Sequence, residues 1–267
     1  MAPLAVNRVV KARVRSAFSR GAAAYDGSTA VQALVRARVQ ALAAESAPGA
    51  RRLLDVGSGT GRLLADLVAA RPGLRGAAVD LAPGMCAATR VAAPGAAVAA
   101  ADAEALPFGD AAFDLAVSSS AFQWLPRLEP ALAECARVLR PGGLLVLALF
   151  ADRTLCELRE AWRAAAGAGA PDRLHRFFTR GEVASALSAA GFGRVRLEEA
   201  LHVEHHADPA DLLRSLKRIG AQGATPGPGG LGGRRVLLEA LERYRSARGG
   251  PDGVPASWHV VYAVASR

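Results

Sequence analysis

The sequence predicts a doubly wound α/β domain with a mostly parallel, seven-stranded sheet. From residue 51 onward, short apolar runs alternate with stretches of helical periodicity, a pattern typical of βα units around a parallel sheet. A glycine-rich turn directly follows the first of these runs, as in many doubly wound domains. With 267 residues, of which 51% are hydrophobic, the chain is long enough to bury a core of this kind.

The expected elements follow one another in a regular order. Two helical segments come first, the second over residues 28–44 and closed by Pro48-Gly49, so residues 1–50 are expected to stand apart from a main domain of residues 51–267. Helices between the early strands begin near Gly61, Pro83 and Leu128. The expected strands span residues 53–56, 76–79, 97–100, 115–117, 144–150, 194–203 and 258–265.

The alternation of strand and helix stops after Phe150. A polar, arginine-rich stretch leads to a helix over 180–190, for which Gly191 is a good C-terminal stop. Asp208 can cap a further helix that runs to about residue 219, and a Gly/Pro-rich loop separates it from a helix over 234–246. Residues 151–178 and 208–247 are expected to be insertions with helical content on the substrate side of the domain.

The chain carries a formal net charge of +9, which leaves two interpretations open. Lys11 and Lys217 are its only lysines, and the rest of the chain is rich in alanine, arginine and glycine, so a coding bias can make every surface basic. Alternatively, the positive charge attracts an acidic partner. Charge alone does not choose between them.

The composition argues against several classes of protein. No run approaches the roughly 20 apolar residues of a membrane span, and basic residues interrupt the apolar positions of residues 1–18, so neither a membrane anchor nor a signal peptide is expected. Cys86, Cys135 and Cys156 have no metal-ligand spacing, and their odd number argues against a disulfide framework. The histidines at 202, 205 and 206 would point to opposite faces of a strand, so no metal site is expected. The protein is therefore expected in the cytoplasm, with its cysteines reduced.

The segment LLDVGSGTGRLL (53–64) carries the most specific signal. A buried strand delivers Asp55, a tight turn is formed by Gly57, Gly59 and Gly61, and an amphipathic helix departs from it. Glycine is needed because a side chain would keep a ligand from the backbone. The acidic residue precedes the first glycine in a D-x-G-x-G-x-G pattern, which differs from the G-x-G-x-x-G of dinucleotide-binding domains.

Further polar positions follow at the ends of the next two strands. Asp80 ends the second strand, where an acidic side chain can bind both ribose hydroxyls, and Met85 of LAPGM follows. Asp102-Ala103 ends the third strand, where the aspartate can accept a hydrogen bond from an adenine amino group. This order, continued by FDLAVSSSAFQW (113–124) and VLRPGGLLVLALF (138–150), resembles the class I S-adenosylmethionine-dependent methyltransferases.

The resemblance implies a Rossmann-like fold and S-adenosylmethionine as the cofactor. Methyl transfer from a sulfonium is an in-line displacement, so the protein mainly aligns the reactants and keeps water out. The residues expected to bind the cofactor are Asp55, Gly57, Ser58, Gly59, Asp80, Leu81, Met85, Asp102, Ala103 and Ser118.

The loop after the fourth strand, SSSAFQW, bears on the methyl acceptor. It has neither the Asn/Asp-Pro-Pro-aromatic sequence of enzymes that methylate nucleobase amines nor the Pro-Cys pair of cytosine C5 enzymes, which argues against nucleic acid. A carboxylate acceptor is ionised at about pH 7 and needs no general base, so no catalytic residue is assigned. Cationic or hydrogen-bonding groups would orient it.

Over nearly its full length the chain resembles the malonyl-acyl-carrier-protein O-methyltransferases of biotin synthesis. The shared stretches are AFSRGAAAYD (17–26), AFQW (121–124), RFF (176–178), LLRSLKRIGAQG (212–223) and WHVVYAVASR (258–267). The likeness implies esterification of the free carboxylate of malonyl-acyl carrier protein or malonyl-CoA. Carrier proteins are acidic, which would give the basic surface a use. Methylation of another small acceptor, such as a free dicarboxylic acid or a quinone precursor, is the alternative.

The candidates for the acceptor side are Tyr25, Arg176, Arg214 and Lys217. Arg214 and Lys217 are three positions apart on one helical face, which suits a carboxylate or the phosphate of a carrier arm, although a solvated face would show the same spacing. Arg176 is a third cation of the same kind. Tyr25 lies where residues 1–50 would close over the cofactor as a lid, with a packing role as the alternative. Phe122 and Trp124 would line the pocket or join the core.

Overall fold

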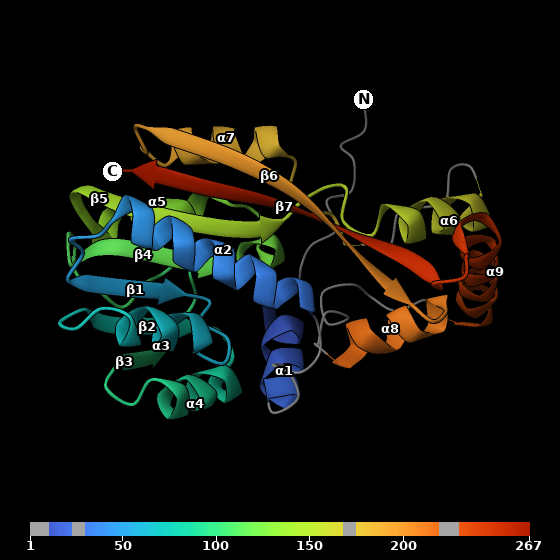
Figure 1. Cartoon of the computed structure of the whole chain (residues 1–267), viewed down its shortest axis with the longest axis horizontal. Helices are drawn as coiled ribbons and strands as arrows, with labels where there is room; N and C mark the ends of the chain where they lie inside the picture. Colours follow the sequence, from blue (N-terminus) through green and yellow to red (C-terminus); the bar gives the residue numbers. More distant parts are fainter. Residues whose placement is uncertain (1–10, 23–29, 168–174, 219–229) are drawn as a thin grey trace.

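A computed structural model describes residues 11–22, 30–167, 175–218 and 230–267 (Figure 1). Within these residues a seven-stranded sheet has the order β3-β2-β1-β4-β5-β7-β6. β7 runs antiparallel to both of its neighbours, and the other pairs are parallel. The predicted doubly wound, mostly parallel sheet is confirmed.

All seven expected strands are present, and all but β3 are longer than expected, β5 and β7 by five residues each. β5 begins at Leu139 because the chain continues in the sheet through Pro141-Gly142-Gly143, with an irregular register opposite Phe113. β6 and β7 pair as far as His206 opposite Val254, beyond the end of β5. The strands are β1 (Arg52–Val56), β2 (Arg75–Asp80), β3 (Ala97–Ala100), β4 (Phe113–Ser119), β5 (Leu139–Phe150), β6 (Val195–His206) and β7 (Val254–Ser266).

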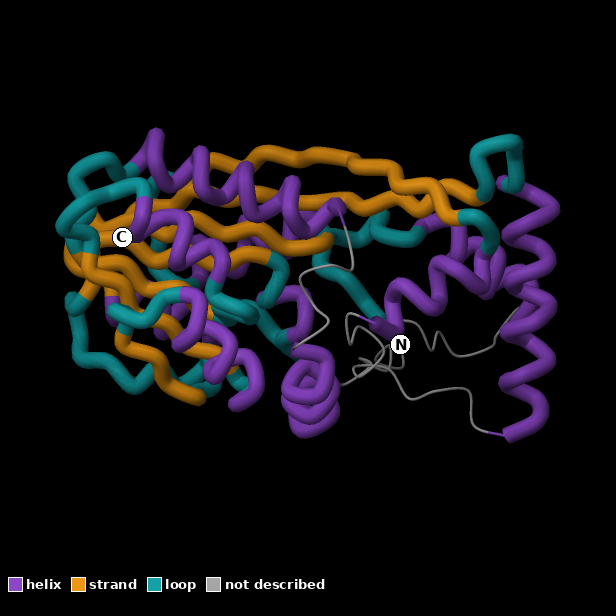
Figure 2. The backbone as a smooth tube through the Cα atoms, turned by 60° about the horizontal axis from the view of Figure 1, so that its bottom comes forward, coloured by secondary structure: helices purple, strands orange, loops and turns teal. Residues whose placement is uncertain are grey.

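Helices cover both faces of the sheet (Figures 1 and 2). α2 (Ala30–Ser46) and α3 (Arg62–Ala69) bury their apolar residues in a cluster on one face. α5 (Glu129–Val138) and α7 (Arg180–Ala189) contribute to the cluster on the other. α4 (Pro83–Ala92) packs beside β2 and β3, and α1 (Lys11–Gly21) contacts α4. Two apolar layers therefore sandwich the sheet, as burial of both faces of a parallel sheet requires.

The prediction that residues 1–50 form a lid is wrong for α2. Val31, Val35, Val39 and Leu42 recur at helical spacing and are at most 1% exposed, because they pack against β4, β5 and β7. This helix is part of the main fold. Of the described residues in this segment, α1 is the helix that lies over the pocket described below.

The C-terminal insertions form a small cluster of their own at one end of the molecule. α6 (Cys156–Ala166), α8 (Pro209–Arg218) and α9 (Gly230–Arg248) meet the projecting ends of β6 and β7 there (Figure 1). α6 lies in the insertion of residues 151–178, for which helical content was expected without bounds, and Leu158, Ala161 and Trp162 give it a buried face at i, i+3, i+4 spacing. None of the helices in the described ranges is long and apolar enough to cross a membrane.

Candidate functional site

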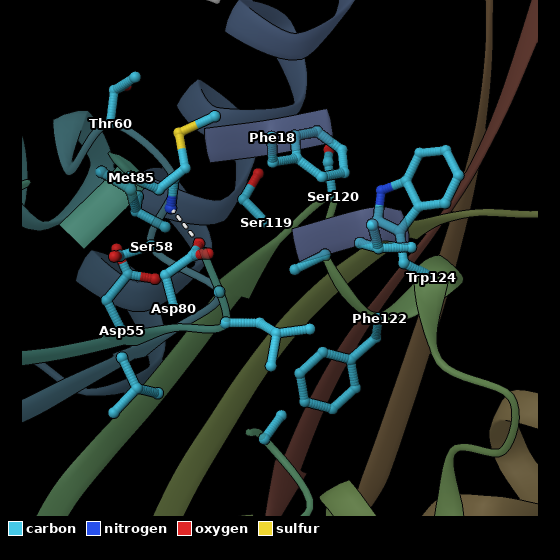
Figure 3. Close-up of a pocket in the computed structure, with 18 of the residues that line it drawn as sticks. Phe18, Asp55, Ser58, Thr60, Asp80, Met85, Ser119, Ser120, Phe122 and Trp124 are labelled. Atoms are coloured by element: carbon cyan, nitrogen blue, oxygen red, sulfur yellow. Dashed lines mark hydrogen bonds between the residues drawn. The ribbon is translucent and has the colours of Figure 1, made fainter. Parts of the chain in front are cut away.

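A pocket lies at the carboxyl ends of β1, β2 and β4, under α1 (Figure 3). The strand order reverses between β1 and β4, which is where doubly wound sheets bind their ligands. Side chains from α1 and α2 complete its wall. Of the residues expected to bind the cofactor, those that line the pocket are Asp55, Gly57, Ser58, Gly59, Asp80, Leu81, Met85, Asp102 and Ala103.

The glycine turn has a backbone that other residues would strain. Gly57 has a φ of +74°, and a Cβ there would overlap the Cβ of Ala121. Gly61 has a φ of +81°, and its Cβ would come within 2.7 Å of Thr89 Cα. The N–H groups of Gly57 and Ser58 both donate to Val79 O, at 2.8 and 3.1 Å, so the turn is fixed to β2. Because glycine has no side chain, the turn can pack closely against Ala121 and Thr89, and its pocket side is left open for a ligand.

Asp80 holds the floor of the pocket. Its Oδ2 accepts the N–H of Gly59 at 2.9 Å, shown as a dashed line in Figure 3, and its Oδ1 accepts the N–H of Ala82 at 2.8 Å. Burial nevertheless raises the pKa of Asp80 to about 6, although both hydrogen bonds lower it. A carboxylate with two lone pairs still available faces the pocket and can bind a pair of hydroxyls.

Asp55 is the most strongly perturbed acid that lines this pocket. It is 1% exposed, and its Oδ2 has no hydrogen-bond partner among the described residues. Burial, followed by the charge of Asp80, raises the pKa of Asp55 to about 8. Two neighbouring carboxylates, one of them with an unpaired oxygen, form an environment that a positively charged ligand would stabilise.

At the opposite side of the pocket, Asp102 is bound to α1. Lys11 Nζ lies 2.7 Å from Asp102 Oδ2 and 2.8 Å from Glu104 Oε2. Burial lowers the pKa of Lys11, but the hydrogen bonds and charges of the two acids outweigh burial and leave that pKa raised. α1 is thus fastened over the pocket at the strand end where an adenine was expected.

Ser118 was expected at the pocket, and the structure corrects this. Its hydroxyl donates to Val56 O at 2.7 Å and is fully buried within the sheet. The next two residues line the pocket instead. Ser120 has a φ of +57°, and its Oγ is buried without a partner among the described residues. Since a serine at positive φ is strained, this conformation marks a position that the surrounding structure enforces.

An aromatic wall closes the side of the pocket nearest α1. Phe18 meets Trp124 edge-on, with ring centroids 5.6 Å apart, and Trp124 lies 4.8 Å from His175 (Figure 3 shows the first two). His175 Nε2 lies 2.9 Å from Gln123 O, and burial lowers the pKa of His175 to about 4. Phe122 is buried in the core and also lines the pocket. These rings exclude water without adding charge.

The cations expected at the acceptor side lie outside this pocket. Arg176 is half-exposed and paired with Glu182 of α7, and Arg214 is exposed and lies 3.5 Å from Asp211. Lys217 is exposed on the same helix as Arg214. Tyr25 lies outside the described residues. Long basic side chains pair with local acids, and the pair of Arg214 with Asp211 has the i, i+3 spacing at which neighbours on one helix meet.

Three cations line the pocket that the sequence did not single out. Lys11 comes from α1, Arg36 from α2 and Arg62 from α3. Arg36 also lies 3.6 Å from Asp66. Their place follows from how α1 and α2 pack over the glycine turn, which no local motif encodes. Lys11 alone carried a signal, as one of two lysines in the chain.

The three histidines of β6 are arranged as expected of a strand. His202 and His206 are partly buried on one face, and His205 is exposed on the other. His206 Nδ1 lies 3.3 Å from Asp211 Oδ2. Within the described ranges, no group of three histidine, cysteine or acidic side chains could hold a metal ion.

Known proteins of similar sequence include methyltransferases. The Methyltransferase domain family matches residues 54–147. A malonyl-[acyl-carrier protein] O-methyltransferase of Geobacter sulfurreducens is 47% identical over 96% of this chain and 98% of its own length, and one of Methylococcus capsulatus is 38% identical over 94% and 91%. A biotin biosynthesis bifunctional protein BioHC of Cellvibrio japonicus is 36% identical, and the match covers 50% of it.

Solved structures share the fold at low identity. The YcgJ protein of Bacillus subtilis has a TM-score of 0.60 at 17% identity, with 86% of this chain and 98% of that chain covered. A Haemonchus contortus N-methyltransferase in complex with S-adenosylhomocysteine has a TM-score of 0.55 at 17% identity, with 86% and 52% covered. These structures bear out the fold, and the full-length relatives identify the family. The chain belongs to the malonyl-[acyl-carrier protein] O-methyltransferase family.

Proposed function

We propose that this protein transfers the methyl group of S-adenosylmethionine to the free carboxylate of a malonyl thioester on acyl carrier protein. Family membership supports the reaction, and the pocket supports its chemistry. The described residues that line the pocket include no histidine, cysteine or tyrosine, so none of them offers the reactants a neutral general base. A carboxylate needs none, because it is already ionised at about pH 7. The three cysteines are all free thiols, in keeping with a reducing cytoplasm.

The residues of the pocket fit the proposed cofactor end to end. Asp102 would accept from the adenine amino group beside Ala103, and Asp80 would accept from the ribose hydroxyls. The unpaired Oδ2 of Asp55 would face positive charge of the methionine portion. Arg36 and Arg62, at the glycine-turn end, would bind its carboxylate. When bound, the cofactor supplies an electrophilic methyl group on a sulfonium.

The protein contributes alignment and exclusion of water. Phe18 and Trp124 cover the region between the cofactor residues and the end of β4, where the acceptor would enter. Holding the two reactants in line converts a bimolecular encounter into an effectively unimolecular step. A dry wall also favours reaction, since the charges of carboxylate and sulfonium neutralise one another in the transition state.

The reaction is tested by mass spectrometry of the acceptor. Purified protein incubated with S-adenosylmethionine and malonyl-acyl carrier protein should yield the methyl ester, whereas amines and phenols should remain unmodified. Succinyl-carrier protein, malonyl-CoA and free malonate serve as comparison acceptors. Absence of ester from every malonyl thioester would refute the proposal, and ester formed from a free dicarboxylic acid alone would favour the small-acceptor alternative.

Ser120 is the polar group that we assign to the acceptor carboxylate. Its backbone is held from both sides, because its N–H donates to Ala148 O at 2.8 Å and its C=O accepts from Gln123 Nε2 at 2.7 Å. Its Oγ is left without a partner at the pocket, and Ser120 is 9% exposed. An unpaired buried hydroxyl is costly, so a native hydroxyl in this state is expected to pair with a ligand.

Two substitutions separate the hydroxyl of Ser120 from its backbone. Ser120→Ala removes the hydroxyl and keeps the strain, and Ser120→Gly removes both. Each should lower kcat/KM for the malonyl thioester about tenfold or more, since a hydrogen bond to a charged group contributes about 1.5–3 kcal/mol. Affinity for S-adenosylhomocysteine should stay unchanged. Wild-type kcat/KM in the glycine variant would show that the hydroxyl has no role in binding the acceptor.

A further inference from the structure

The outer surface of α1 carries positive charge that nothing in the described structure neutralises. The helix, KARVRSAFSRG, has four basic residues and no acidic one. Lys11 pairs with Asp102 and Glu104. Arg13 and Arg15 are exposed and form no ion pair within the described residues, and Arg20 donates only to Ser16.

Much of the remaining arginine content is neutralised locally. On α9, Arg243 pairs with Glu239 and Arg245 with Glu242, and Arg248 reaches Glu160 of α6. The net charge of +9 is therefore not spread evenly over the molecule. The sequence of α1, by contrast, contains no acidic residue with which its arginines could pair.

The geometry of α1 joins this charge to the pocket. Lys11, Val14 and Phe18 recur at helical spacing and line the pocket. With 3.6 residues per turn, Arg13 and Arg20 project from the opposite side of the helix, and Arg15 lies at its flank. Figures 1 and 2 both show α8, which carries the exposed Lys217, as the next helix beyond α1 at this end of the molecule.

We propose that Arg13, Arg15 and Arg20, here called the α1 basic face, form the docking surface for the acidic carrier protein that presents the malonyl thioester. This inference rests on the proposed function. A carrier bound to the outside of α1 would sit at the wall of the pocket, within reach for an acyl group on a flexible arm. Unpaired charges at such a rim speed association and select partners of opposite charge.

The same features argue against a lipid surface as the occupant. A helix that lies on a membrane inserts an apolar face into it. The apolar residues of α1 are already used, because Val14 is 8% exposed and Phe18 packs on Trp124. The outward side of α1 carries arginines and no large apolar side chain, which suits an acidic protein as the partner.

The test compares two acceptors and two pairs of substitutions. Arg13→Glu with Arg15→Glu reverses the charge of two residues of the α1 basic face. The matched control, Arg75→Glu with Arg194→Glu, reverses two exposed arginines away from the pocket, the first residue of β2 and the residue just before β6. Kinetics are measured with malonyl-acyl carrier protein and with malonyl-N-acetylcysteamine, a small thioester without a carrier. The double substitution on α1 should lower kcat/KM for malonyl-acyl carrier protein at least tenfold, mainly by raising KM. It should also make this kcat/KM less sensitive to salt concentration.

The small thioester and the control pair distinguish the outcomes. Activity of the α1 variant on malonyl-N-acetylcysteamine should stay within about twofold of wild type, as should activity of the control on both substrates. An equal loss on both substrates would mean that α1 acts on the site itself, and unchanged carrier kinetics would place docking elsewhere. If the wild type binds anionic vesicles or nucleic acid and the α1 variant does not, while the kinetics of the variant with the carrier substrate stay normal, the α1 basic face belongs to those partners instead. If the wild type esterifies neither substrate, the proposed function fails rather than the docking surface.

Discussion

Asp80→Ala should lower the affinity for S-adenosylhomocysteine about a hundredfold or more. The side chain is expected to accept two hydrogen bonds from the ribose, each contributing about 1.5–3 kcal/mol because the acceptor is charged. It also accepts the N–H groups of Gly59 and Ala82, so its loss loosens the glycine turn as well. Isothermal titration calorimetry of the purified variant measures the change.

Two further variants show which of these roles dominates. Asp80→Asn keeps the size of the side chain, but its NH2 group must face one of the two backbone donors, so it should bind nearly as poorly as the alanine variant. Asp110→Ala removes a carboxylate that is 75% exposed outside the pocket and should leave the affinity unchanged. Wild-type affinity in Asp80→Ala would contradict the assignment of the ribose site.

Asp55→Asn should stabilise the ligand-free protein, increasingly so as the pH rises. The pKa of Asp55 is raised from 3.8 to about 8, so between these values the folded protein holds a proton that the unfolded chain has released. Stability therefore falls with rising pH across this window, by roughly 1.4 kcal/mol per unit for this group. The isosteric amide carries no charge and removes that dependence.

The advantage of Asp55→Asn is expected to grow by about 3–4 kcal/mol between pH 5 and pH 8 and then to level off. Urea denaturation at several pH values, without ligand, measures the free energy of unfolding. Asp66→Asn, which changes an exposed carboxylate on α3, is the control and should show no such trend. A constant difference between wild type and Asp55→Asn across this range would show that Asp55 is ionised in the folded protein.

The cofactor side of the pocket could be predicted because short sequence stretches encode it. A buried strand followed by glycines fixes where Asp55 and Gly57 lie, and parallel pairing brings Asp80 and Asp102 to the same edge. Ser118 shows the limit of that reasoning. The predicted strand ended at Val117, but β4 continues to Ser119, so Ser118 still lies within the sheet and donates to Val56 O. Ser120, just past the end of the strand, faces the pocket with a positive φ.

The cations that line the pocket could not be predicted in the same way, because their positions depend on contacts between distant segments. Arg36 reaches the pocket through the packing of α2 on the sheet, and Lys11 through a pair with Asp102, 91 positions away. Arg176 was a reasonable candidate by type, but Glu182 pairs with it. The burial of α2 could have been inferred, since Val31, Val35 and Val39 recur at helical spacing.

The separate cluster formed by α6, α8 and α9 has a consequence for how such enzymes diversify. Its core residues, Leu158, Leu212 and Tyr244 among them, belong to neither of the apolar layers that sandwich the sheet. The two long strands β6 and β7 connect it to the rest of the fold. Mutations can therefore accumulate in this cluster while the packing of the sheet is left undisturbed, and with it the glycine turn and the strand ends that line the pocket. Relatives can vary at this end of the molecule and keep the pocket.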